Sequence, residues 1–146
     1  MSLEYLDVRK VVKCAEHKAV LDEKSKKLKK NVIDSCAAKP FTTGSFVFNE
    51  NSNNQLTLTL PTFDQTLLFK ERLVVINDVP LLKYTAIDPT EEHDREVVSL
   101  YLAKNGLVYI GEYKPNPSYE YEDDSLFLDI LESTLQALKS VGKISY

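Results

Sequence analysis

Few residues in this sequence have the chemistry and spacing that catalysis requires. Nucleophilic catalysis needs a nucleophile, a base and a group that orients the base, and His17 and His93 are the only histidines. Neither Cys14 nor Cys36 lies in a catalytic signature, and the chain has no G-x-S-x-G turn. Its 4 glycines form no glycine-rich phosphate-binding loop. We therefore expect a protein that is not an enzyme and that uses no cofactor.

An acidic segment around His93 is the best candidate for binding a metal ion. Glu91, Glu92, Asp94 and Glu96 flank this histidine, and carboxylates and imidazole are common ligands of divalent cations. The spacing matches neither an EF-hand loop nor H-E-x-x-H. Charges of this kind commonly keep a strand edge soluble, so we expect a solvated loop without a metal.

A lysine-rich run at residues 24–30 is the strongest basic feature. On a helix, Lys26, Lys27 and Lys30 share one side, where they could contact phosphates. No aromatic residue is interleaved to stack on bases, and the chain carries a net charge of −4. We expect a solvated helix face and no nucleic-acid partner.

The segment from residue 113 to residue 124 is the most suggestive of protein binding. Tyrosine supplies a large contact area with a polar tip, and clustered carboxylates steer a basic partner. The alternative is a surface loop whose acids favour the N-terminus of the following helix. The predicted partner-binding residues are Tyr113, Tyr119, Glu120, Tyr121, Glu122 and Asp123.

The elements that would position these residues begin with a helical region. Residues 3–38 contain neither glycine nor proline, and Pro40 disfavours helix just beyond them. Two apolar stripes do not join smoothly across residues 22–26, which leaves open one bent helix or two helices. The first stripe is Val8, Val11, Val12, Ala15 and Ala19, and the second is Leu21, Leu28, Val32 and Cys36.

Alternating apolar residues follow from residue 41 and predict five to seven antiparallel strands in a meander. A final amphipathic helix should pack on this sheet. Its predicted apolar face is Phe127, Ile130, Leu131, Leu135 and Leu138. The expected architecture is a single α+β domain over residues 1–146, with an N-terminal helical region, the meander sheet and the C-terminal helix.

A hairpin at Asn105-Gly106 has consequences for function. A two-residue loop would pair Leu102 with Tyr109. It would also place Tyr101, Val108 and Ile110 together on a second apolar face. That face could pair with another copy in a homodimer, line a ligand cavity or lie beneath the N-terminal helix, and all three explanations remain open.

Composition sets the broad class of protein. The chain has 146 residues, of which 43% are hydrophobic, so it can bury a core without metal or disulfide. Two cysteines suggest buried thiols in a reducing compartment, and neither a signal peptide nor a membrane-spanning run is visible.

We expect a small cytoplasmic, non-catalytic protein-binding factor, such as an inhibitor, accessory subunit or chaperone-like protein. The alternative is a small-molecule binder with an apolar pocket between the sheet and the C-terminal helix. Tyr84, Tyr101 and Tyr109 would supply phenol groups to that pocket. An enzyme of unfamiliar type is the less favoured third possibility.

Overall fold

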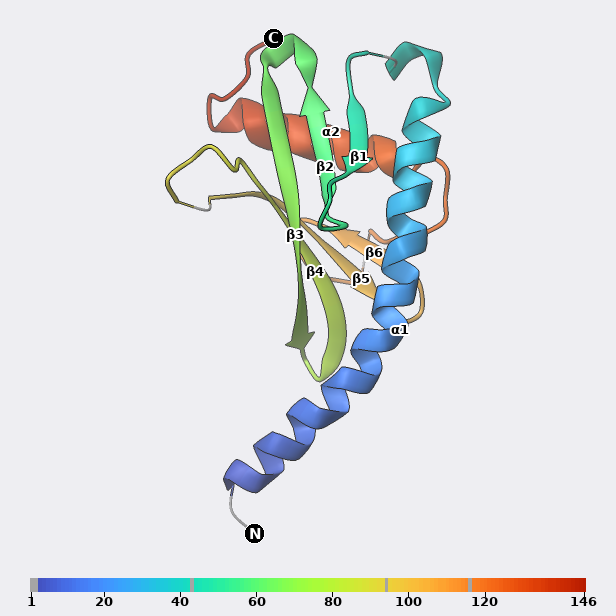
Figure 1. Ribbon diagram of the computed structural model, residues 1–146, viewed down its shortest axis with the longest axis vertical. Helices are drawn as coiled ribbons and strands as arrows, with labels where there is room; N and C mark the ends of the chain where they lie inside the picture. The colour runs from blue at the N-terminus through green and yellow to red at the C-terminus, as the bar shows by residue number, and fades with distance from the viewer. Residues whose placement is uncertain (1–2, 43, 94, 116) are drawn as a thin grey trace.

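The computed structural model describes residues 3–42, 44–93, 95–115 and 117–146, with side chains from residue 6 onward. Two α-helices pack on one face of a curled antiparallel sheet whose strands follow one another in chain order (Figure 1). This arrangement confirms the predicted α+β fold. The elements are α1 (Leu3–Ala37), β1 (Val47–Glu50), β2 (Leu56–Leu60), β3 (Gln65–Ile76), β4 (Val79–Ile87), β5 (Glu96–Ala103), β6 (Leu107–Ile110), β7 (Tyr119–Glu120) and α2 (Leu126–Ser140).

The N-terminal region is one helix of 35 residues. Only its second half packs on the sheet, through the predicted stripe of Leu21, Leu28, Val32 and Cys36. The first half runs past the β3–β4 hairpin and away from the rest of the molecule (Figure 1). One helix therefore has two halves with different surroundings.

The main core lies between one face of the sheet and both helices. Leu58, Phe69 and Leu100 from the strands join Val32 of α1 and Phe127 of α2 in one buried cluster. The predicted apolar face of α2 is confirmed: four of its five members are buried, and Leu135 is partly buried against them.

The C-terminus of α2 is capped by a glycine. Gly142 has a φ of +79°, which glycine adopts without strain. The Gly142 N–H donates to the Lys139 carbonyl, and the Lys143 N–H donates to the Leu138 carbonyl. These two bonds form a Schellman motif, which satisfies carbonyls that the helix end would leave unpaired.

The predicted register of the β5–β6 hairpin is wrong by one residue. Leu102 pairs with Val108, and Tyr101 pairs with Tyr109, because the loop holds three residues, from 104 to 106. Gly106 alone takes a positive φ, of +88°, as in a type I turn closed by a glycine bulge. The added residue exchanges the faces of Val108 and Tyr109.

The second face of the sheet therefore differs from the expected one. Val108 and Ile110 belong to the main core, and only Tyr101 of the predicted trio lies on the second face. There Tyr101 and Tyr109 pack with Leu81 and Ala103, and Tyr113 folds back over them. The Tyr109 and Tyr113 rings meet edge to face at 4.8 Å. Among the described residues, neither helix contributes to this cluster, so of the three explanations that the sequence left open, the one in which the N-terminal helix covers this face is wrong.

Candidate functional site

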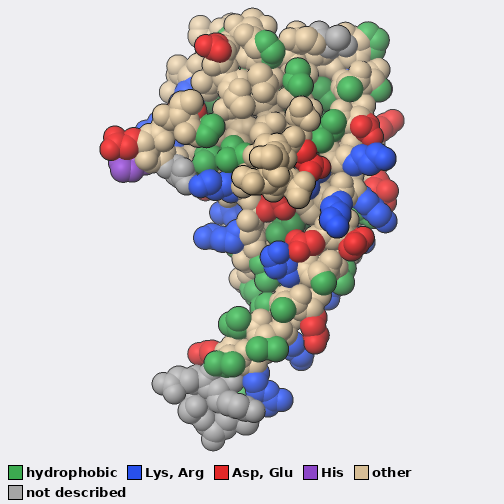
Figure 2. All heavy atoms as spheres, in the orientation of Figure 1, with side chains coloured by type: hydrophobic (Ala, Val, Ile, Leu, Met, Phe, Trp, Pro, Cys, Tyr) green, Lys and Arg blue, Asp and Glu red, His purple; other side chains and the backbone are tan. Residues whose placement is uncertain are grey.

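The projecting half of α1 carries an exposed apolar surface. Val8, Val11 and Val12 are 59%, 70% and 65% exposed, and Ala15 and Ala19 are exposed beside them. We call these five residues the α1 stripe. Hydrophobic side chains are visible along this part of the molecule in Figure 2. The first stripe that the sequence predicted thus forms a helix face, and the sheet does not cover it.

The α1 stripe does not continue the face by which α1 packs on the sheet. Each residue of an α-helix advances by about 100° around the axis, so the middle of the stripe and the middle of the packed set from Leu21 to Cys36 point roughly 120° apart. The sheet side of the projecting half carries Cys14 and His17, which are half-buried. His17 Nδ1 lies 2.9 Å from Lys104 Nζ in the β5–β6 loop. This offset is the physical reason why the two stripes do not join in the sequence.

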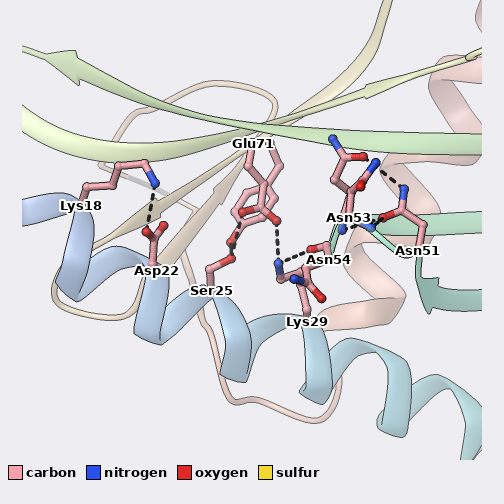
Figure 3. A network of polar contacts seen from close by, with 10 residues as sticks. Lys18, Asp22, Ser25, Lys29, Asn51, Asn53, Asn54 and Glu71 are labelled. Atoms are coloured by element: carbon pink, nitrogen blue, oxygen red, sulfur yellow. Dashed lines mark hydrogen bonds and ion pairs between the residues drawn. The ribbon is translucent and has the colours of Figure 1, made fainter. Parts of the chain in front are cut away.

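A buried polar network holds α1 to the sheet just beyond the stripe (Figure 3). Ser25 and Lys29 lie on the packed side of α1 and are 2% and 5% exposed. Lys29 Nζ donates to Glu71 Oε1 of β3 at 2.8 Å and to the Asn54 carbonyl at 2.6 Å. Tyr84 OH of β4 donates to Ser25 Oγ at 2.6 Å, and Ser25 Oγ lies 3.4 Å from Glu71 Oε2. Burial disfavours charge unless it is paired, so these groups tie α1 to β3 and β4.

The chemistry of this network is that of a structural clamp. Burial raises the pKa of Tyr84 far above its usual value, so its hydroxyl stays protonated and donates a hydrogen bond. Lys29 is ion-paired with Glu71. The ionisable groups of the network, Lys29, Glu71 and Tyr84, are therefore occupied by interactions within the network.

A polar pocket of about 700 Å³ opens beside the clamp, between α1 and the β1–β3 strands. Three lysines and three carboxylates line it, and Lys18 pairs there with Asp22 at 2.9 Å. The sequence analysis missed Lys29 as a buried residue, although it follows Ser25 by four positions on the apolar side of the helix. Residues four positions apart lie on the same face of a helix, so this spacing could have indicated that Lys29 faces the sheet.

The six predicted partner-binding residues do not form one surface. Tyr119 is partly buried against the main core, and Tyr121 is 8% exposed, with Lys24 Nζ 5.0 Å above its ring. Tyr113 covers the opposite face of the sheet. Glu120 and Glu122 are exposed. Asp123 accepts from the N–H and Oγ of Ser125, and these bonds lower its pKa.

The acidic end of this segment helps to form the turn that precedes α2. Ser125 makes no side-chain cap bond of its own, and Asp123 instead organises the turn before the helix. Asn31 of α1 adds bonds to the Tyr121 and Asp123 carbonyls at 3.2 and 2.8 Å. The segment thus has a demonstrated structural role, whereas its predicted role in binding stays a prediction. Asn116 lies outside the described residues.

The acidic loop that was considered for metal binding holds an ion pair. Lys143 pairs with Glu91 and with Asp88, the latter at 3.1 Å. Within the described ranges, no group of three metal-ligating side chains gathers anywhere. His93 is exposed, and Asp94 lies outside the described residues.

The remaining candidates have separate environments. Lys26, Lys27 and Lys30 are exposed on α1, as expected for a solvated face. Cys36 is buried, and burial raises the pKa of its thiol. Cys14 is only half-buried, so the expectation that both thiols are buried is wrong for Cys14.

The phenols proposed for an apolar ligand pocket are split between two faces. Tyr84 lies in the main core and bonds to Ser25, whereas Tyr101 and Tyr109 lie in the cluster on the other side of the sheet. Core side chains from the strands, α1 and α2 pack against one another in the space that such a pocket would occupy.

Comparisons with known proteins supply no relative for this chain. It matches no protein-family model, no curated protein and no solved structure. Within the part of the chain that the structure describes, no helix has both the length and the apolar character needed to cross a bilayer. The functional argument therefore depends on the molecule's own surfaces.

Proposed function

We propose that this protein is a non-catalytic protein-binding factor that takes up a partner helix along the α1 stripe. The observation that carries the proposal is the exposure of Val8, Val11 and Val12 on a helix face turned away from the sheet. A contiguous apolar patch of this kind marks an interaction site more often than isolated exposed residues do. A partner helix can cover such a stripe by placing its own apolar side chains between these residues.

The clamp adds to the suitability of this face for binding. Ser25 and Lys29 fix the direction of α1 only a few residues beyond Ala19. A helix whose direction is fixed in advance loses less orientational freedom on association. The clamp is therefore part of the proposed mechanism, because it presents the stripe away from the sheet.

The flanks of the stripe indicate a partner of mixed charge. Arg9 and Lys13 lie on this half of the helix together with Glu16. A partner that carries both signs beside an apolar seam would match these flanks. Steering of a basic partner by Glu120 and Glu122 would involve a separate surface near the start of α2.

A photo-crosslinking amino acid at Val12 tests the proposal in the cells that make the protein. We expect a discrete covalent adduct with one protein from position 12 and none from position 13, which is equally solvent-facing but points about 100° away. The adduct formed from position 19 should disappear when Val8 and Val11 are changed to Asp. Equal adducts from positions 12 and 13, or none from either, would contradict a binding role for the stripe.

A further inference from the structure

We infer that the helix which packs on the α1 stripe is α1 of a second copy of this chain. The inference rests on the proposed function and adds the identity of the partner. It follows from the spacing of the stripe, from the charges beside it and from the position of the sheet relative to it.

The spacing matches that of a two-stranded coiled coil. Val8, Val12, Ala15 and Ala19 follow one another at intervals of four, three and four residues, which is the alternation of a and d positions in a heptad repeat. Val12 and Ala19 then occupy a positions, and Val8 and Ala15 occupy d positions. We call these four residues the seam. Small alanines let two helix axes approach closely, and β-branched valine at an a position favours two strands. The seam ends where Asp22 and Lys26 take the next two positions.

The flanking charges are complementary to those of an identical helix. Positions e and g border the seam and face the partner. In a parallel pair, Lys18 at g would lie beside Glu23 of the second copy at e. In an antiparallel pair, Arg9 would lie beside Glu16 of the second copy. At the flanking e and g positions from Arg9 to Glu23, neither orientation brings like charges together, so the same surface can serve both partners of a two-fold dimer. The apolar seam itself ends at Ala19, before the charged d position of Asp22.

The sheet leaves room for the second helix. The β5–β6 loop reaches α1 at His17, which lies almost opposite the middle of the stripe around the helix axis. The packed side of α1, from Leu21 onward, is turned roughly 120° from the stripe. A helix docked on the stripe would therefore contact α1 alone, and the two sheets would lie on the outer sides of the pair.

Disulfide scanning of the full chain tests this inference. In a Cys14→Ser background, Val8→Cys, Val12→Cys and Ala19→Cys are oxidised separately and in pairwise mixtures, with Lys13→Cys as the exposed control. A parallel dimer gives a crosslinked dimer from each single seam variant, whereas an antiparallel dimer gives one chiefly from the mixture of Val8→Cys with Ala19→Cys. Either pattern supports the second copy, provided that Lys13→Cys stays monomeric.

Sedimentation of the unmodified protein provides an independent readout. A seam of about three helical turns is short, so we expect a reversible monomer–dimer equilibrium in the micromolar range. Val12→Asp should abolish self-association, and in protein dilute enough to be monomeric it should leave the unfolding midpoint unchanged, because Val12 is 65% exposed.

A monomer at the highest soluble concentration, with no crosslinking beyond that of Lys13→Cys, would overturn the inference. If photo-crosslinking at Val12 then still captures one different protein, the proposed function stands and only the identity of the partner is wrong. If it captures nothing, the proposed function falls as well.

Discussion

At the scale of single residues, buried polar groups decide how α1 meets the sheet. Lys29 is 5% exposed and has two acceptors, so its charge is compensated. Ser25 links Tyr84 to Glu71 in the same network. Removing one member would leave a buried group without its partner, which costs more than the hydrogen bond itself contributes.

Tyr84→Phe should therefore destabilise the protein by about 1–3 kcal/mol, the usual cost of leaving a buried polar group without its partner. The ring still fills the core, so only the bond to Ser25 is lost. Urea unfolding measures the change, with Tyr146→Phe as the matched control because Tyr146 is 67% exposed. Equal stability of the two variants would show that the bond contributes nothing.

Asp88 predicts a dependence of stability on pH. Bonds from the Thr90 hydroxyl and N–H, followed by Lys143, lower the pKa of Asp88 to about 2. Because the folded pKa lies below the unfolded value near 4, this stabilisation is present above about pH 4 and is lost as the pH falls towards 2.

The test compares the wild-type protein with Asp88→Asn by urea unfolding across this range. At pH 6 the variant should be less stable by about 1–2 kcal/mol, and the gap should close near pH 2. A gap that is constant from pH 6 to pH 2 would contradict the assignment of the pH dependence to this carboxyl.

At the scale of elements, the two tight hairpins differ in loop length. The two-residue turn predicted at Asn105-Gly106 is instead found at Asn77-Asp78, between β3 and β4. Asn77 and Asp78 both take positive φ values, of 50° and 62°, and form the two-residue turn between β3 and β4. At Asn105-Gly106 only Gly106 does so. Tyr121 explains part of this choice: its N–H donates to the Gly106 carbonyl at 2.9 Å, and its ring fills the space where a Cβ of residue 106 would lie.

The C-terminal helix is the clearest case of an element specified by its own sequence. Leu131 is 4% exposed and Leu128 is 37% exposed on the same helix, so they form a matched pair. Leu131→Ala should cost about 2–5 kcal/mol through lost burial and a residual cavity. Leu128→Ala should cost clearly less, and denaturant unfolding separates the two. A loss below about 0.5 kcal/mol for Leu131→Ala would remove this helix face from the core.

At the scale of the whole molecule, α1 joins a packed half to a half that lacks tertiary support. The first half projects past the sheet (Figure 1), and its three valines are more than half exposed. Isolated helical segments of this length are marginally stable in water. The protein alone should therefore show a gradient of local stability along one continuous helix.

Hydrogen exchange should reveal that gradient. At low protein concentration, amides of residues 8–17 should exchange faster than those of residues 24–36, because local opening is easier where tertiary contacts are few. Protection of the first half should rise as the concentration increases and the stripe becomes covered. Equal protection of both halves in dilute protein would contradict the view that the first half lacks support.

The sequence alone was sufficient for the order and type of the elements. The absence of glycine and proline from residues 3–38 predicted helix, alternation predicted the strands, and the spacing from Phe127 to Leu138 predicted α2 with its buried face. These signals are local, since each depends on the period of its own element. The sequence also showed two stripes on α1 that do not join, without indicating which of them faces a core.

Only the tertiary structure decided which surfaces are covered. At the β5–β6 loop, Tyr121, a residue 15 positions beyond Gly106 along the chain, packs against Gly106, and the shift of one residue in the register moved Val108 into the core and Tyr109 out of it. Burial of Lys29 required Glu71 of β3 and Asn54 of the β1–β2 turn, both distant in the sequence. Exposure of the α1 stripe followed from which side of α1 packs on the sheet and from the projection of the first half of the helix past it, a relation between elements that no local pattern contains.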